Sequence, residues 1–226
     1  MKTVLIEGGG GSVNLAFFVL FSLDAVFHLF ACWKGKKQLA DRTKIFLMPL
    51  LAMCVFPICS TGHFFLLCGL IFGAVGDICL LRTENRLLFL SGLAAFAVGH
   101  LFYVLLFAKD TMFSFSSWVL YFVAAVYLAA IVFIYHRLFP FLPQGMKVIP
   151  AFYMLIICMM GTFAVLRAVS GPDVRTIAAV FGTLLFIVSD TRLAFAVFKG
   201  PTRRSAFVVM LTYIVAQAAI AASFIW

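Results

Sequence analysis

Long apolar runs, separated by short loops that are polar or contain glycine and proline, divide this chain into eight segments. Each run is close to the roughly 20 residues that an α-helix needs to cross the hydrocarbon core of a bilayer. The pattern therefore predicts eight membrane-spanning helices, near residues 13–33, 44–60, 63–81, 87–108, 116–136, 147–168, 174–198 and 205–226. The break around Ser60–His63 is the least marked of those between helices.

The composition agrees with this pattern, because 65% of the residues are hydrophobic and only 11% are charged. Soluble domains carry about 25% charged residues. We therefore predict an all-α, polytopic membrane protein with one integral membrane domain over residues 1–226 and a flexible N-terminus over residues 1–12. This N-terminus lacks the features of a cleaved secretory signal, so we expect the first helix to stay in the mature protein.

Basic residues are divided unevenly between the two sets of loops that this topology creates. Twelve lie in or beside the odd-numbered loops, whereas four lie on the other side. Cytoplasmic loops are enriched in Lys and Arg, so both termini are predicted to face away from the cytoplasm. The net charge of +9 then reflects orientation in the membrane, and we predict no nucleic-acid partner. The larger group comprises Lys34, Lys36, Lys37, Arg42, Lys44, Arg82, Arg86, Arg137, Lys147, Lys199, Arg203 and Arg204.

A short internal repeat links the two halves of the chain. The third predicted helix ends in GDICLL and the seventh contains SDTRLAF, while the second and sixth open with KIFLMP and KVIP. A repeat of four helices keeps its direction across the membrane, so the pattern suggests a parallel 4+4 arrangement. It places Asp77 and Asp190 in equivalent positions.

The topology also predicts the depth of the polar residues inside the spans. At 1.5 Å of rise per residue, Asp77 lies about 7 Å before Arg82 and Asp190 about 13 Å before Lys199, so both fall in the cytoplasmic half. A candidate pocket at this depth adds Lys44, Tyr153, Ser189, Arg192 and Tyr213. Such residues can simply bond neighbouring helices, although ionisable side chains inside spans usually have a function. Arg192 can also extend to the membrane surface or pair with Asp190.

Other polar residues suggest less. Asp24 and His28 are spaced to bond each other on the first helix. His63, His100 and His136 fall at three depths and cannot share one metal ion, so we predict neither a metal nor another cofactor. All six cysteines lie in apolar runs without a C-x-x-C pair, which favours buried free thiols. Glycines of the third and fourth helices, including Gly69 and Gly99, are expected to allow close helix packing.

Two buried carboxyl groups near each other are suited to proton chemistry. Removal from water favours the protonated form of a carboxylic acid, and a neighbouring carboxylate favours it further. One member of such a pair can stay protonated near neutral pH while the other is ionised. This arrangement suits general acid–base catalysis and proton-coupled transport equally well, and a purely structural role is a third alternative.

Four segments resemble the YhhN-type lysoplasmalogenase family, and the likeness runs from about Lys44 to the C-terminus. They are GDICLL, GLAAFAVGHLFY, FGTLLFIVSDTRLAF and TYIVAQAAIAAS, one in each of the third, fourth, seventh and eighth helices. The resemblance implies hydrolysis of the vinyl ether bond of a lysoplasmalogen to a fatty aldehyde and a glycerophospho compound. The motif positions that it brings to this chain are Asp77, His100, Tyr103, Ser189, Asp190 and Gln217.

This chemistry fits the two aspartates, because a vinyl ether is hydrolysed by proton delivery to carbon and needs no cofactor. The hypothesis is that Asp77 and Asp190 are catalytic and that a lysophospholipid enters from the inner leaflet, with its phosphate near Lys44 or Arg192. The predicted substrate-binding residues are Lys44, His100, Tyr103, Tyr153, Ser189, Arg192, Tyr213 and Gln217. Membrane lipids are the other expected partners, and the sequence does not indicate the oligomeric state. The rival hypothesis is a small proton-coupled transporter that uses the same carboxylates.

Overall fold

The computed structural model describes residues 10–56, 63–111 and 117–225, which are almost entirely helical. Eight α-helices occur in these ranges, which confirms the predicted fold class and helix number. They are α1 (Gly10–Lys34), α2 (Lys37–Val55), α3 (Phe64–Cys79), α4 (Arg86–Lys109), α5 (Ser117–Leu138), α6 (Val148–Ser170), α7 (Val174–Lys199) and α8 (Arg203–Ile225). Short 3-10 turns follow α3 and α5: η2 (Leu80–Arg82), η3 (Phe139–Phe141) and η4 (Gln144–Met146).

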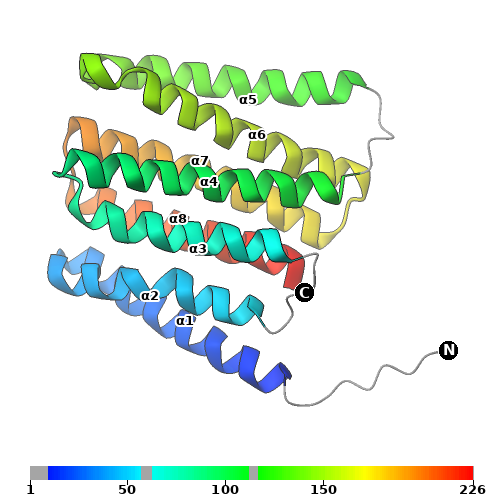
Figure 1. Cartoon of the computed structure of the whole chain (residues 1–226), viewed down its shortest axis with the longest axis horizontal. Helices are drawn as coiled ribbons and strands as arrows, with labels where there is room; N and C mark the ends of the chain where they lie inside the picture. The colour runs from blue at the N-terminus through cyan, green and yellow to red at the C-terminus, as the bar shows by residue number, and fades with distance from the viewer. Residues whose placement is uncertain (1–9, 57–62, 112–116, 226) are drawn as a thin grey trace.

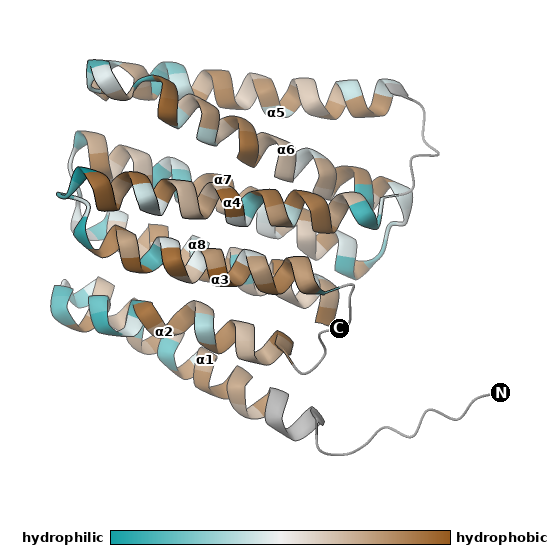
Figure 2. Cartoon of the chain, in the orientation of Figure 1, coloured by the Kyte–Doolittle hydropathy of each residue, from teal (hydrophilic) through white to brown (hydrophobic). Residues whose placement is uncertain are grey.

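The helices lie side by side and alternate in direction (Figure 1). The α1–α2, α3–α4, α5–α6 and α7–α8 connections all lie at one end, which carries most of the Lys and Arg residues and is called the basic end below. Helix α1 begins and α8 ends at the opposite end. Figure 2 shows hydrophilic residues gathered at the ends of the bundle and hydrophobic residues along its length.

Within the described residues, seven helices are long and apolar enough to cross a membrane, and α2 is the exception. Helix α2 begins at Lys37 rather than at the predicted residue 44. Its first turns contain Asp41, Arg42 and Lys44. These charged residues lower the hydropathy there, so the pattern predicts a helix that starts too late. Residues 57–60 of the predicted second span lie outside the described residues, as do residues 1–9 of the predicted flexible N-terminus, whereas residues 10–12 belong to α1.

Local sequence explains where several helices begin and end. The Asn85 side chain accepts hydrogen bonds from the backbone N–H groups of Leu87 and Leu88 at 2.9 and 3.2 Å, which caps α4. Asp173 and Thr176 form a reciprocal capping box at the start of α7. Hydrogen bonds from the Thr176 backbone and side chain hold the pKa of Asp173 below its usual range. Gly35, at φ 67°, adopts the left-handed conformation that the tight α1–α2 turn requires.

Glycine allows two helix pairs to approach closely, as the sequence predicts for α3 and α4. A Cβ atom on Gly99 would lie 3.1 Å from the carbonyl oxygen of Gly69 across the α3–α4 contact. A Cβ atom on Gly182 would lie 2.9 Å from the Ala216 carbonyl across the α7–α8 contact. Both pairs are therefore packed through backbone atoms, which is typical of small residues at membrane helix interfaces.

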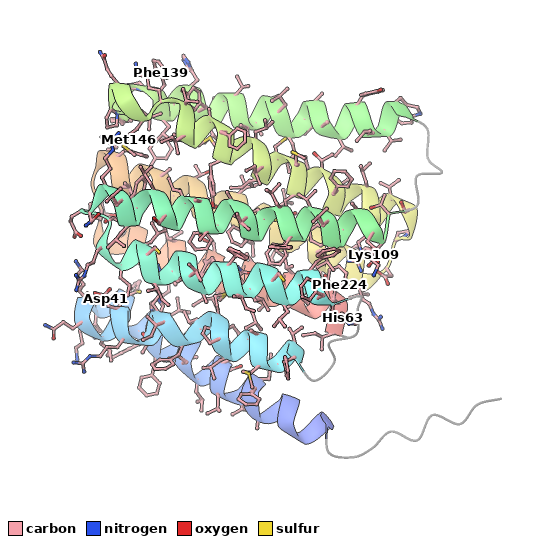
Figure 3. The ribbon with its side chains drawn as sticks, viewed as in Figure 1. Asp41, His63, Lys109, Phe139, Met146 and Phe224 are labelled. Atoms are coloured by element: carbon pink, nitrogen blue, oxygen red, sulfur yellow. The ribbon has the colours of Figure 1, made fainter. Side chains whose placement is uncertain are left out.

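The α3–α4 pair faces the α7–α8 pair, which lies behind it in Figure 1, through long side chains. Phe96 of α4 and Phe186 of α7 each contact the ring of Tyr213 on α8, with ring centroids 6.0 and 5.5 Å apart. At the end opposite the basic end, a ring nitrogen of His63 lies 3.2 Å from the Phe224 carbonyl and ties α3 to α8 (Figure 3). The space between these two helix pairs contains the candidate site.

Candidate functional site

Asp77 and Asp190 line the same cavity, about 280 Å³ in volume, although they are 113 positions apart in the sequence. Its wall includes the backbone turns near Thr83 and Pro201, so the cavity lies toward the basic end of the bundle. Helices α2, α3, α4, α7 and α8 all contribute to it. The sequence-predicted residues Lys44, Ser189 and Tyr213 also belong to the wall.

Asp77 is almost fully buried, with an exposed fraction of 2%, and has partners from two other helices. The ammonium of Lys44 on α2 lies 3.2 Å from its Oδ1 atom. The hydroxyl of Tyr213 on α8 donates a hydrogen bond of 2.8 Å to its Oδ2 atom. Because a buried carboxylate is costly unless it is paired, these two contacts stabilise the ionised form of Asp77.

Asp190 is partly buried and has a different environment. The hydroxyl of Tyr153 on α6 donates a hydrogen bond of 2.5 Å to its Oδ2 atom. Within the described part of the chain, no Lys or Arg forms an ion pair with Asp190. The two carboxyl groups of the cavity therefore differ in the part of the chain that the structure describes: Asp77 contacts a cation and Asp190 does not.

A second polar group lies deeper in the bundle, beside the Asp77–Tyr213 contact. Tyr103 on α4 donates a hydrogen bond of 2.7 Å to the side-chain carbonyl of Gln217 on α8. Gln217 also interacts with the Tyr213 hydroxyl, one helical turn away. Both Tyr103 and Gln217 have exposed fractions of 1%. Polar contacts thus connect Lys44 and Asp77 to the middle of the bundle.

His100 contacts mainly aromatic rings near the site. Its ring packs edge-on against Phe186 at 4.5 Å and against Tyr153 at 5.7 Å between centroids. Neither ring nitrogen has a partner of good hydrogen-bonding geometry among the described residues, although the Phe96 carbonyl lies one turn earlier. His100 is therefore placed beside the site, and it does not line the cavity.

Two predicted site residues are placed less favourably for a direct role. Ser189 lines the cavity, but its hydroxyl donates a hydrogen bond of 3.0 Å to the Val209 carbonyl and so joins α7 to α8. Arg192 is exposed and is not part of the cavity wall. Residues two positions apart on a helix do not face the same way. Asp190 faces the cavity, so Arg192 faces away from it.

The spacing of Asp24 and His28 predicts a bond that the described residues do not form. One ring nitrogen of His28 lies 2.8 Å from the Thr43 hydroxyl and the other 3.5 Å from the Cys32 sulfur. His28 is therefore part of the α1–α2 packing, and Asp24 Oδ2 is buried without a partner among the residues that the structure describes.

The cavity lined by Asp77 and Asp190 is called the acidic cavity below. A narrow apolar cavity of about 50 Å³ adjoins it and was not predicted from the sequence. Helices α4, α5, α6 and α7 line it with side chains such as Phe89, Ile131 and Met154. Asp190, together with Phe96 and Leu193, belongs to the walls of both cavities. Asp190 thus lies where an apolar compartment meets a polar one. Apolar residues are so common in this chain that no pattern singles out the ones that form this wall.

Fold and cavity together define an integral membrane protein whose two acidic side chains are held inside the helix bundle by partners from other helices. The chain belongs to the YhhN family, whose pattern matches residues 39–224. No solved structure matches it.

Three curated relatives of the chain are named lysoplasmalogenases. The chain is 33% identical over 159 residues to human lysoplasmalogenase TMEM86A, and this match covers 69% of this chain and 62% of that protein. It is 34% identical over 155 residues to pig lysoplasmalogenase TMEM86B, covering 69% of this chain and 61% of the relative. Cattle lysoplasmalogenase TMEM86A is 31% identical over 162 residues, with 69% and 62% covered. The chain thus spans somewhat less than two thirds of the length of these relatives.

Proposed function

We propose that this protein is a lysoplasmalogenase that hydrolyses the vinyl ether bond of alkenyl lysophospholipids by acid–base catalysis with Asp77 and Asp190. The observation that carries the proposal is that both aspartates line one cavity and that, among the residues the structure describes, Asp77 contacts a cation and Asp190 does not. The names of the relatives support the same reaction.

The reaction requires a proton at carbon. A vinyl ether carries electron density on the alkenyl carbon remote from oxygen, and protonation there breaks the double bond and forms an oxocarbenium ion. Water then adds to the carbon bound to oxygen and gives a hemiacetal. The hemiacetal collapses to a fatty aldehyde and the glycerol hydroxyl of the headgroup product. A general acid and a general base inside the site supply these proton transfers.

Asp190 is the proposed acid. It contacts no cation within the described ranges, and its Oδ2 atom already accepts the Tyr153 hydroxyl, which leaves Oδ1 to carry a proton. It also lies where the apolar and polar cavities meet. A substrate whose alkenyl chain begins in the apolar cavity therefore presents the remote alkenyl carbon to Asp190. The first carbons of the chain fill the narrow cavity, and the rest of the chain lies in the bilayer.

Asp77 is the proposed base. Its negative charge, balanced by Lys44 at 3.2 Å, stabilises the oxocarbenium ion electrostatically. It accepts a proton from water as the hydroxyl adds to carbon, and later returns this proton to the departing glycerol oxygen. Asp190, left ionised after the first step, recovers its proton from the hemiacetal hydroxyl. Both groups end the cycle as they began it, and one water molecule is consumed.

The remaining predicted residues act through these two. Tyr213 and Tyr153 orient the carboxyl groups, while Tyr103 and Gln217 support Tyr213 from the middle of the bundle. His100 fixes the ring of Tyr153 by packing. The excess of basic residues supports the orientation that the sequence predicts, with the termini outside the cytoplasm and the site in the cytoplasmic half.

The test is direct measurement of aldehyde release. The full chain, purified in detergent, is incubated with an alkenyl lysophospholipid, and the aldehyde is quantified as a hydrazone. Stoichiometric aldehyde and glycerophospho product support the proposal, with the diacyl and alkyl ether analogues left intact. Absence of product, together with substrate-dependent proton flux in sealed liposomes, would assign the same aspartates to a transporter instead.

A further inference from the structure

A third cavity, about 240 Å³ in volume, lies between α1, α2 and α8 at the basic end of the bundle. Asp41 in Figure 3 marks this end. Its charged wall residues are Lys36, Lys37, Lys44 and Asp41. Three lysines against one aspartate give the cavity a positive charge at neutral pH, which favours an anionic ligand.

The three lysines of this cavity differ in their ion-pair partners. Lys44 contacts Asp77, and Lys37 forms a loose contact of 3.7 Å with Glu84, in which both side chains are 73% exposed. Such exposed pairs are weak and exchange readily for a better partner. Lys36 forms no ion pair within the described residues. Two ammonium groups, those of Lys36 and Lys37, are thus available to an incoming anion.

His28, which also lines this cavity, is already bonded. Both ring nitrogens of His28 have partners, the Thr43 hydroxyl at 2.8 Å and the Cys32 sulfur at 3.5 Å. His28 therefore forms a fixed part of the wall, and the lysines are the groups that can bind a ligand.

This basic cavity adjoins the acidic cavity. Lys44, Ala206 and Met210 belong to both walls. Since Asp190 joins the acidic cavity to the apolar one, the three cavities follow in the order apolar, acidic and basic. An alkenyl lysophospholipid has its parts in this same order: an apolar chain, an acid-labile ether, and a phosphodiester separated from that ether by the three-carbon glycerol.

We propose that the basic cavity binds the phosphodiester of the lysophospholipid headgroup through Lys36 and Lys37, with Lys44 at the boundary. This inference rests on the proposed function, because the ordering of the substrate assumes that its vinyl ether lies between Asp77 and Asp190. The headgroup subsite then fixes the depth at which the vinyl ether meets the acid. Inorganic phosphate presents the same anionic oxygens to lysine as the phosphodiester does, so it is the alternative ligand of this cavity.

The experiment compares two substrates and two double variants. The substrates are an alkenyl lysophosphatidylcholine and the matching alkenylglycerol, which has the same vinyl ether and no phosphate. The test variant is Lys36→Gln/Lys37→Gln. The matched control is Lys34→Gln/Arg42→Gln, which removes two positive charges from the same end of α1 and α2 but from residues outside this cavity wall.

The test variant should raise KM for the phosphate-containing substrate by about tenfold, which is the loss expected for a charge-assisted contact. Its KM for alkenylglycerol should stay at the wild-type value, and the control variant should leave both constants unchanged. An equal change for both substrates, or no change for either, would overturn the headgroup subsite. If neither substrate yields aldehyde from the wild-type protein, the proposed function itself has failed.

A binding measurement separates the two phosphate sources without relying on turnover. Glycerophosphocholine, which carries the phosphodiester but no chain, should raise the melting temperature of the wild-type protein and of the control variant, but not that of Lys36→Gln/Lys37→Gln. Inorganic phosphate at the same concentration should have a much smaller effect. Stabilisation by inorganic phosphate alone would assign the cavity to free phosphate and contradict the proposal.

Discussion

The ammonium group of Lys44 lies 3.2 Å from Oδ1 of Asp77, and this ion pair joins α2 to α3 inside the bundle. It distinguishes Asp77 from Asp190, whose partner Tyr153 is neutral. Lys44 comes from α2, the helix before that of Asp77, and Tyr153 comes from α6, the helix before that of Asp190. One carboxyl group is thereby paired with a cation, while the other is available to hold a proton.

Replacement of Lys44 should therefore reduce turnover through Asp77. Lys44→Gln removes the cation, so the ionised form of Asp77 loses a contact worth about 1.5–3 kcal/mol. We expect kcat to fall at least about tenfold, by the same factor for alkenyl lysophosphatidylcholine and for alkenylglycerol. Lys44→Arg, which keeps the charge, should recover much of the activity. Unchanged kcat in Lys44→Gln would contradict the role given to this ion pair.

The two tyrosines should differ in importance. Tyr153→Phe removes the hydroxyl that orients Asp190, whereas Asp77 keeps Lys44 after Tyr213→Phe. We expect kcat to fall about tenfold or more in Tyr153→Phe and by a smaller factor in Tyr213→Phe. Steady-state aldehyde release from the two purified variants measures this. Equal losses, or the reverse order, would contradict the unequal dependence of Asp190 and Asp77 on their tyrosines.

The close contact between α7 and α8 should make Gly182 sensitive to substitution. A Cβ atom there would lie 2.9 Å from the Ala216 carbonyl, so Gly182→Ala forces the two helices apart. Overpacking of this kind costs about 1–3 kcal/mol. A Cβ atom added at Gly171 would have no neighbour within 4 Å, so Gly171→Ala is the control. Thermal unfolding in detergent should show a lower melting temperature for Gly182→Ala alone, and equal melting temperatures would refute the close contact.

The capping residue Asp173 gives a prediction about pH. Hydrogen bonds from Thr176 hold its pKa below the usual range in the folded protein. A lowered folded-state pKa stabilises the protein above the pKa of the unfolded carboxyl, about 3.9, and this stabilisation is lost as the pH falls through the folded-state pKa. Asp173→Asn should therefore melt slightly below the wild type at neutral pH, and the difference should shrink below about pH 4. A difference that grows on acidification would contradict the capping charge.

The helices were predictable from the sequence because bilayer thickness imposes one length on every apolar run. The start of α2 was not predictable, because a segment that contains Lys37, Asp41 and Lys44 has the hydropathy of a loop. They lie at the basic end, where charged side chains reach the membrane surface.

The candidate site was predictable only in part. Charge bias and helix rise place Asp77 and Asp190 at a similar depth, and the structure places both in one cavity. Depth alone does not specify helix rotation, so the partners Lys44 and Tyr153 could not be assigned to one aspartate or the other. The same reason explains Arg192, which shares the depth of Asp190 but is exposed.

If Asp190 delivers the proton to carbon, Asp190→Asn should abolish aldehyde release. Asn keeps the shape and still accepts the Tyr153 hydroxyl. Because Asp190 contacts no cation among the described residues, the substitution leaves none of their charges unpaired. Asp173→Asn is the matched control far from the cavity. We expect kcat for aldehyde release to fall at least about 100-fold in Asp190→Asn with an unchanged melting temperature, while Asp173→Asn keeps wild-type turnover. Wild-type kcat in a folded Asp190→Asn protein would contradict this role of Asp190.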